Sequence, residues 1–370
     1  MSTEPGLFIG LMSGTSLDGV DGVLLESPGD AQPKVQAHAA LAFPAGLREE
    51  CLALNAAGFD ELHRSALAAR QLVDLYAEVI AALLHASGVR ASSVRAIGAH
   101  GQTVRHRPDL GYTVQINAPA LLAERCGITV VADFRSRDVA AGGQGAPLVP
   151  AFHRAVFAMP GVDVAVLNLG GFANLSLLFA DGRTSGFDTG PGNALLDHWA
   201  QRHLGQPYDA QGEWAAGGVV QADLLAQFLA DPYFSRPAPK STGRDDFHPA
   251  WMERHLRTLK ASLSPQDVQA TLAALTAHSV AQALLRAMPG VCNLVVCGGG
   301  ARNTDLLSRL QQMLPNVTCL LSDDRGIPAE QVEAAAFAWL SQQTLLGLPG
   351  NLPSVTGAAG PRVLGAIYPA

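Results

Sequence analysis

A turn dense in glycine, hydroxyl and carboxylate residues follows the first apolar segment, and it reads GLMSGTSLDGVD at 10–21. Small side chains and accessible backbone N–H groups in such a turn can hold phosphate oxygens. The carboxylates of Asp18 and Asp21 suit Mg²⁺. The turn is not a P-loop, because GxxxxGK[ST] is absent and no lysine lies nearby. We interpret it as a phosphate-binding turn, with an ordinary polar hairpin turn as the alternative.

Two further glycine turns have a similar character. In LNLGGFANLS (167–176), Asn168 and Asn174 flank a double glycine between two apolar runs. In CGGGARN (297–303), a triple glycine precedes an expected helix start, which permits close approach of a flat adenosine group. A β-turn and tight helix–sheet packing are the respective alternatives. The GxGxxG spacing of a dinucleotide fold is missing.

The segment GFDTGPGN (186–193) places a carboxylate at an expected strand end, in a turn stiffened by proline. A carboxylate held in this way can act as a general base toward a bound hydroxyl or water. Asp188 is alternatively a helix cap, although Asn193 is nearer the next helix and is the better cap. Further polar residues are scattered along the chain and could line a cleft, as polar residues at strand ends often do, although each taken singly is more often a surface or salt-bridge residue. They are His100, Gln102, Arg135, Arg137, Asp138 and Glu333.

Composition excludes several classes of protein. The net charge of −7 and the lack of long basic runs argue against a nucleic-acid partner. No stretch reaches the roughly 18 apolar residues that span a bilayer, and the N-terminus lacks an export signal, so we expect no membrane partner. The five cysteines are dispersed without a CxxC pair, which fits a reducing cytoplasm.

The spacing of apolar residues predicts the elements that must position these side chains. We expect a polar turn at 101–108 and an irregular tail at 351–370. A strand–glycine turn–strand unit occurs twice, around Gly14 and Gly170, which indicates two lobes on a similar plan. Strands are predicted at 7–12, 20–26, 95–100, 128–134, 163–169, 172–180 and 293–297. Helices are predicted at 61–86, 118–126, 148–157, 194–204, 266–287 and 328–346.

Six motifs together resemble the anhydro-N-acetylmuramic acid kinase family: GLMSGTSLDGVD, GAHGQT, ADFRSRDVAAGGQGAPLVP, LNLGGFANLS, FDTGPGNALLD and CGGGARN. They run in order over nearly the whole chain, and the tail SVTGA…LGAIYP (354–368) also resembles the family. The motif residues show no departure from the pattern of that family. The resemblance implies an α/β fold of the hexokinase–actin–heat-shock ATPase superfamily. That is a two-lobed actin-like ATPase (ribonuclease H-like) fold with a central cleft for ATP and substrate.

On this resemblance we expect an N-terminal lobe at 1–145 plus 345–370 with the first phosphate hairpin. A C-terminal lobe at 146–344 would hold the second hairpin, the catalytic aspartate and the adenosine-binding segment. The implied reaction converts 1,6-anhydro-N-acetylmuramic acid, ATP and water into N-acetylmuramic acid 6-phosphate and ADP, in peptidoglycan recycling. The implied partners are this sugar, ATP and Mg²⁺, and the implied assembly is a cytoplasmic homodimer.

The resemblance also implies roles for individual residues. Asp188 would take a proton from the attacking water, Glu333 would hold or polarise that water, and Asp18 would lie near Mg²⁺. His100 and Arg135 would bind the sugar's carboxylate or hydroxyls, with Arg137 left open as an alternative to Arg135. Gln102, Gly190 and Asn193 are also expected at the sugar. The residues expected at ATP are Gly10, Ser13, Gly14, Thr15, Ser16, Asn168, Gly170, Gly171, Asn174, Gly298, Gly299, Gly300 and Asn303.

Three alternatives remain open from the sequence. The chain could be a kinase of the same superfamily that phosphorylates an ordinary sugar hydroxyl. It could be an actin-like assembly ATPase, since a self-complementary surface leaves no sequence signature. A glycosidase without ATP is the third, and it leaves the glycine turns unexplained.

Overall fold

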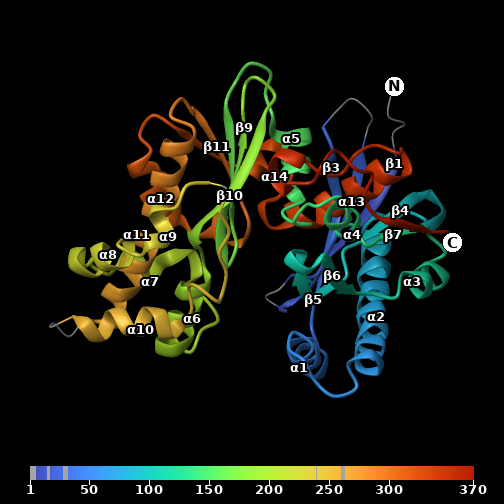
Figure 1. Ribbon diagram of the computed structural model, residues 1–370, viewed down its shortest axis with the longest axis horizontal. Coiled ribbons are helices and arrows are strands. Elements are labelled where there is room, and N and C mark those ends of the chain that lie inside the picture. The colour runs from blue at the N-terminus through green and yellow to red at the C-terminus, as the bar shows by residue number, and fades with distance from the viewer. Residues whose placement is uncertain (1–5, 15–16, 28–31, 239, 260–262) are drawn as a thin grey trace. The chain divides into compact units, whose positions relative to one another are not determined.

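The computed structural model describes residues 6–14, 17–27, 32–238, 240–259 and 263–370 (Figure 1). The chain divides into two compact units, residues 1–156 with 326–370 and residues 157–325. This division differs from the expected lobes at both boundaries. Most of helix α5 (Val149–Phe157) and all of α13 (Val332–Leu345) belong to the first unit, because α13 packs directly on strands of its sheet.

A six-stranded sheet forms the first unit, in the order β13-β7-β4-β1-β2-β3. Strand β1 runs antiparallel to β2 and parallel to β4, and β7 continues the parallel side. The strands are β1 (Gly6–Met12), β2 (Gly19–Ser27), β3 (Lys34–Ala42), β4 (Val94–Ala99), β7 (Val130–Ala132) and β13 (Ala366–Tyr368).

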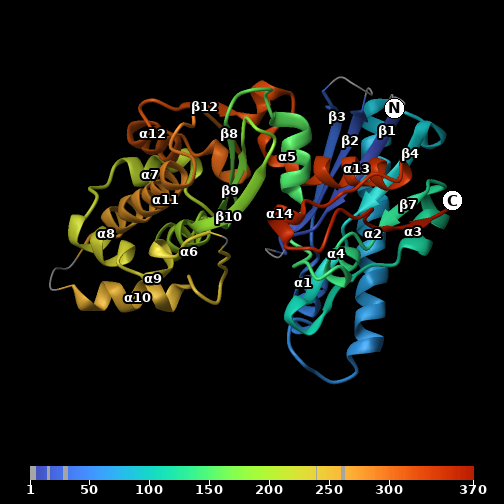
Figure 2. The ribbon, with the colours of Figure 1, turned by 45° about the horizontal axis from the view of Figure 1, so that its top comes forward.

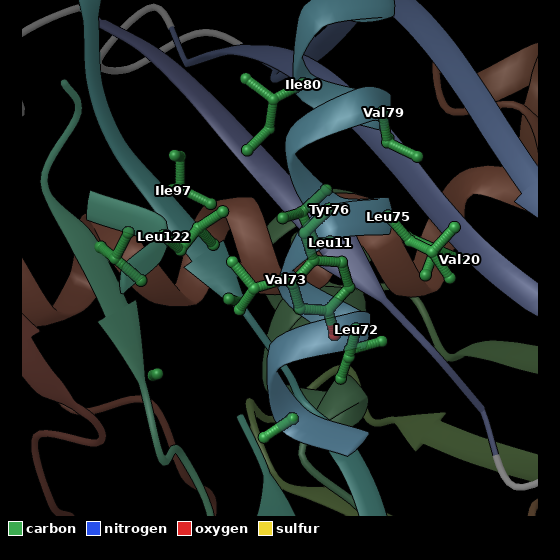
Figure 3. Close-up of a cluster of buried hydrophobic side chains, with 14 of the residues drawn as sticks. Leu11, Val20, Leu72, Val73, Leu75, Tyr76, Val79, Ile80, Ile97 and Leu122 are labelled. Carbon is green, nitrogen blue, oxygen red and sulfur yellow. The ribbon is translucent and has the colours of Figure 1, made fainter. Parts of the chain in front are cut away.

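Helix α2 (Glu61–Ser87) covers one face of this sheet and supplies much of its core (Figure 3). Leu11 of β1 packs in that core with Tyr76 of α2. Successive strand residues point to opposite faces, so the neighbouring Gly10 faces the other side, where α13 lies. The remaining elements of this unit are α1 (Ala45–Ala53), β5 (Gln102–Arg107), β6 (Tyr112–Ile116), α3 (Pro119–Cys126), α4 (Ser136–Ala140) and α14 (Pro353–Thr356).

A five-stranded sheet forms the second unit, in the order β10-β9-β8-β11-β12. Strand β8 runs antiparallel to β9 and parallel to β11, and β11 runs parallel to β12. This repeats the order β3-β2-β1-β4-β7 of the first unit, with the same directions. The strands are β8 (Val164–Leu169), β9 (Phe172–Leu178), β10 (Thr184–Pro191), β11 (Asn293–Cys297) and β12 (Thr318–Leu321).

Helix α11 (Pro265–Ala287) runs through the helical part of the second unit and contacts α6, α7, α8 and α12 (Figure 2). It is the one helix in the described part of the chain that is long and apolar enough to cross a membrane, and 78% of its apolar window is buried. Such burial identifies a core helix. The other helices are α6 (Ala194–Leu204), α7 (Glu213–Ala216), α8 (Ala222–Leu229), α9 (Pro232–Ser235), α10 (Pro249–Thr258) and α12 (Thr304–Met313).

Three local expectations need correction. The expected polar turn at 101–108 is largely strand β5, which pairs with β6. The tail at 351–370 is only partly irregular, since it contains α14 and β13. Asp188 lies inside β10 rather than at a strand end. Strand β5 pairs with the adjacent β6 and strand β13 pairs with the distant β7, and the local apolar pattern reports neither pairing.

Candidate active site

Two glycines allow the helix that carries Glu333 to pack closely on the sheet. Gly10 of β1 and Gly98 of β4 are register partners on adjacent strands. A Cβ on Gly10 would collide with the Ala334 carbonyl oxygen, and one on Gly98 with that of Phe337. The pair therefore lets α13 lie directly on the sheet. This packing is by itself a sufficient reason for a glycine at position 10, so a contact from Gly10 to a phosphate is not needed to explain it.

The first glycine turn is fastened to the connection between β4 and β5. Ser13 is 2% exposed, and its hydroxyl donates to the Gly101 carbonyl at 2.9 Å. Gln102 donates through Nε2 to the Gly14 carbonyl at 3.2 Å. The structure thus brings Ser13, Gly14 and Gln102 together, with the Ser13 hydroxyl already engaged. Thr15 and Ser16 lie outside the described residues.

The neutral imidazole of His100 accepts hydrogen bonds from Arg135. Its Nδ1 donates to the Ser13 carbonyl at 3.2 Å, because a carbonyl oxygen only accepts. Its Nε2 therefore accepts from Arg135 Nε at 3.0 Å and Nη2 at 2.9 Å. Burial and the Arg135 charge lower the pKa of His100 to about 3. The imidazole is accordingly uncharged at neutral pH, and it orients the guanidinium.

Arg135 remains a cation in this setting. Burial lowers its pKa to about 10, and the charges of Glu333 and Asp138 oppose that shift. Arg135 Nη1 also donates to the Gly145 carbonyl at 2.8 Å. The first unit thus collects His100, Arg135 and Glu333 in one electrostatic cluster, whereas the Arg137 side chain is exposed.

Asp188 of β10 stands in a row of polar residues across three strands. Asn174 of β9 is the register partner of Asn168 in β8 and also of Asp188 in β10. Partners directly opposite each other on antiparallel strands share a face of the sheet. The register shifts between Asp188 and Gly190, and Gly190 has a φ of +149° that favours glycine. The row therefore sets Asp188 beside the asparagines that flank the second glycine turn.

Asp188 is held by hydrogen bonds to Tyr233, Lys240 and Thr242 of a distant segment, which we call the strap. The Thr242 N–H donates to Asp188 Oδ2 at 3.0 Å, and the Asp188 N–H donates to the Lys240 carbonyl at 3.0 Å. Tyr233 donates through Oη to the Asp188 carbonyl at 2.7 Å. Burial raises the pKa of Asp188, and the Thr242 N–H partly opposes this rise.

Sequence reasoning missed this strap entirely. Tyr233, Lys240 and Thr242 lie some 45 to 54 residues beyond Asp188, in a stretch that reads only as a polar, glycine- and proline-rich excursion. The one available signal was the set of aromatic residues there, which need burial.

The glycines of the second unit divide into packed and open positions. A Cβ on Gly298 would collide with the Asn168 side chain, and one on Gly300 would come within 2.7 Å of the Leu169 Cβ. These two let the turn after β11 close against β8. By contrast, a Cβ on Gly170, Gly171 or Gly299 would meet no atom nearer than 3.5 Å. The space beside these three glycines permits close approach of a ligand.

Two asparagines expected to bind ligands also stabilise the fold. Asn193 donates through Nδ2 to the Leu169 carbonyl at 3.1 Å, and its N–H donates to the Gly170 carbonyl at 2.9 Å. It precedes α6 without a side-chain cap hydrogen bond. Asn303 accepts the Leu306 N–H at 2.9 Å and so caps α12.

The donor set is compatible with a weakly held Mg²⁺. Asp18 is exposed immediately before β2. No group of three or more His, Cys, Asp or Glu side chains that would ligate a metal occurs within the described residues. Mg²⁺ is commonly held by one or two carboxylates together with substrate phosphates and water. Asp18 therefore fits such a site, in which the nucleotide supplies the other ligands.

Residues 6–370 match the sequence model of the family described as anhydro-N-acetylmuramic acid kinase. A relative of that name from Bordetella petrii is 58% identical, over 100% of this chain and 98% of its own length. Another from Variovorax paradoxus is 59% identical over 98% and 99%. The chain belongs to the anhydro-N-acetylmuramic acid kinase family. The predicted resemblance is thereby confirmed over its full extent.

A solved structure supports the predicted two-lobed fold. The (R)-2-hydroxyglutaryl-CoA dehydratase component A of Acidaminococcus fermentans matches 92% of this chain and 99% of its own, with a TM-score of 0.51 and 11% identity. At that identity the likeness concerns the fold alone. The shared strand order of the two sheets confirms the predicted duplication.

Proposed function

We propose that this chain, as an ATP-dependent kinase of its family, converts 1,6-anhydro-N-acetylmuramic acid, ATP and water into N-acetylmuramic acid 6-phosphate and ADP. This reaction serves peptidoglycan recycling. The observation that best supports the assignment of residues is the row Asn168–Asn174–Asp188, whose two asparagines flank the open glycines at 170 and 171. On this proposal the base lies in one row with residues that flank a turn suited to phosphate.

The substrate dictates the order of bond changes. In an anhydro sugar, O6 is bridged to the anomeric carbon, so no free 6-hydroxyl exists. Water forms a bond to the anomeric carbon while the bond from that carbon to O6 breaks. The electron pair goes to O6, which takes the γ-phosphoryl group and releases ADP. The proton lost by the water goes to Asp188.

Asp188 is suited to that role by its environment. Burial raises the pKa of its carboxyl, which makes the ionised form a stronger base. The Thr242 N–H engages Oδ2, so we assign Oδ1 to the water. Glu333 is proposed to hold or polarise the same water. Two carboxylates acting on one sugar are also the arrangement of inverting glycosidases.

Arg135 is proposed to bind the carboxylate or hydroxyls of the sugar, and His100, Gln102, Gly190 and Asn193 are also proposed to bind the sugar. Three N–H groups of the guanidinium are engaged by His100 and Gly145. The other two suit a carboxylate. This assignment favours Arg135 over the exposed Arg137.

ATP is proposed to contact Gly170, Gly171 and Gly299 through its phosphates and adenosine. Mg²⁺ near Asp18 would neutralise phosphate charge when bound. We also propose a cytoplasmic homodimer. All five cysteines are free thiols, which is consistent with a reducing compartment.

A coupled assay with ATP tests the substrate class. The anhydro sugar should be phosphorylated far faster than open N-acetylmuramic acid, whereas an ordinary sugar kinase would prefer the open form. In ¹⁸O-labelled water, direct attack places the label at the anomeric oxygen of the product. Label found in the phosphate instead would contradict the mechanism. Sedimentation with ATP alone tests the assembly ATPase, which should form filaments without sugar.

A further inference from the structure

Asp138 is a fully buried carboxylate that none of the steps above uses. It lies in α4, three residues after Arg135, and its exposed fraction is 0%. Its Oδ2 accepts the Gly145 N–H at 2.8 Å. Its Oδ1 accepts from Asn351 Nδ2 at 2.6 Å and from Thr356 Oγ1 at 2.7 Å. A charge so deeply buried persists only when several donors satisfy it.

The loop at 141–145 and the C-terminal segment at 351–359 are wrapped around this carboxylate. The Gly143 N–H donates to the Asp138 carbonyl at 2.9 Å, and a Cβ on Gly143 would collide with the carboxylate. The Gln144 N–H donates to the Thr356 carbonyl, and the Ala359 N–H to the Ala141 carbonyl, each at 2.8 Å. Asp138 thus joins two segments more than 200 residues apart in sequence.

Gly145 connects this network to Arg135. Its N–H is held by Asp138 and its carbonyl accepts Arg135 Nη1. Its φ of +67° favours glycine, so the loop takes a conformation that other residues disfavour. On the other side of the guanidinium stands His100. Two acceptors therefore fix the direction of the guanidinium. One is His100, directly after β4, and the other is the Gly145 carbonyl, in the loop that Asp138 holds.

We propose that Asp138 is a positioning residue, which acts with Asn351 and Thr356 through Gly145 to aim Arg135 at the anionic group of the substrate. The inference rests on the proposed sugar-binding role of Arg135. It gives the C-terminal segment a part in substrate binding without contact to the substrate. A purely structural tether would stabilise the fold but leave the affinity for sugar unchanged.

Thr356 offers the sharpest test, because its hydroxyl can be removed with little change of shape. Thr356→Val should raise the dissociation constant of the anhydro sugar about tenfold, measured by calorimetry without ATP, since one hydrogen bond to a charged group is lost. The KM for ATP should stay unchanged. Thr356→Ser keeps the hydroxyl and should restore sugar affinity to within about twofold.

A matched control removes another buried threonine hydroxyl from the same region. Thr344 is 7% exposed, and its Oγ1 donates to the Leu364 carbonyl without touching Asp138. Thr344→Val should lower the thermal unfolding midpoint yet leave sugar affinity intact. Equal losses of affinity in Thr356→Val and Thr344→Val would overturn the proposal, because a general loosening of the tail would then be the cause.

A second readout follows the Arg135–His100 contact without any substrate. The ¹⁵N resonance of His100 Nε2 should move toward that of an imidazole nitrogen lacking a donor in Thr356→Val and in Asp138→Asn. Thr356→Ser should retain the wild-type position. An unmoved resonance together with unchanged sugar affinity in Thr356→Val would overturn the positioning role.

Failure of the proposed function has a different signature. If Arg135→Lys leaves sugar affinity unchanged, the sugar-binding role of Arg135 is wrong, while the His100 resonance still reports whether Asp138 positions the guanidinium. If Arg135→Lys weakens sugar binding but Thr356→Val changes neither affinity nor resonance, Arg135 keeps its role and the positioning by Asp138 is refuted.

Discussion

The two units hold their main charged side chains in opposite ways. In the first unit, Arg135 is engaged by three hydrogen bonds to uncharged acceptors, His100 Nε2 and the Gly145 carbonyl. In the second, the carboxylate of Asp188 receives one backbone N–H, from Thr242, among the residues that the structure describes. The sheets beneath them share one strand order. The duplicated framework is therefore common to both, and the difference arises in the segments that surround each charge.

This difference matches two kinds of task. A cation with most of its donors engaged is fixed in direction and keeps its charge, which suits binding. Burial raises the pKa of the Asp188 carboxyl, and the Thr242 N–H only partly opposes this rise, so the carboxylate accepts a proton more readily. We therefore expect Arg135 to contribute mainly to sugar affinity and Asp188 mainly to the rate of the chemical step.

The largest expected effect comes from Asp188→Asn. It removes the base while keeping the shape, so kcat should fall by about 10²- to 10⁴-fold. Sugar affinity measured by calorimetry should change little. A variant that opens and phosphorylates the anhydro sugar at near wild-type rate would show that Asp188 is not the base, and the contrast between the units would disappear.

Next in size is Arg135→Lys. A lysine cannot reproduce the planar fork that meets His100, Gly145 and a carboxylate together, so the dissociation constant of the sugar should rise by about 30-fold. The kcat at saturating sugar should fall much less. Arg137→Lys is the matched control, because Arg137 is exposed, and it should behave as wild type. The reverse result would transfer the binding role to Arg137.

Glycines of the two units should also respond differently to alanine. Gly98→Ala forces a methyl group into the backbone of α13 and should lower the free energy of unfolding by about 1–3 kcal/mol. Gly299→Ala has open space and should change that free energy by less than about 0.5 kcal/mol. It should nevertheless raise the KM for ATP. Denaturant titration and initial rates measure the two effects.

The smallest effect concerns the pH profile of kcat. Asp188 acts as a base only when ionised, so activity is lost as pH falls through its pKa. The Thr242 N–H stabilises the ionised form, and Thr242→Pro removes that donor. The acidic limb should therefore move to higher pH, whereas Thr242→Ala keeps the N–H and should leave it in place. His100, with a pKa of about 3, adds no limb near neutrality.

Much of the framework could be predicted from local pattern. The apolar runs at 7–12 and 163–169 and the helical spacing at 61–86 all correspond to elements of the structure. Their side chains decide their conformation through burial. Strand β13 could not be predicted, because it is defined by backbone pairing with the distant β7. The strand at 102–107 pairs with β6 in a local hairpin, and its polar residues hid it from the apolar pattern.

The site could be predicted residue by residue only where a motif is continuous. Asp188 and the glycine turns are visible as dense local clusters. The hydrogen bond from Thr242 to Asp188 and the one from Thr356 to Asp138 join residues that are far apart in the chain. A threonine gives no sign in sequence of which carboxylate it will meet. The glycines show the same limit, because only the structure separates those packed by a helix from those left open.

The seating of α13 on Gly10 and Gly98 has a consequence for how the chain is made. The first unit takes helix α13 from residues beyond 325, whereas the second unit is one continuous stretch, 157–325. During synthesis from the N-terminus, the second unit can complete its core while the strands of the first still await α13. We therefore expect a nascent chain that ends at residue 325 to protect the amides of β8 and β11 from hydrogen exchange well before those of β1 and β4.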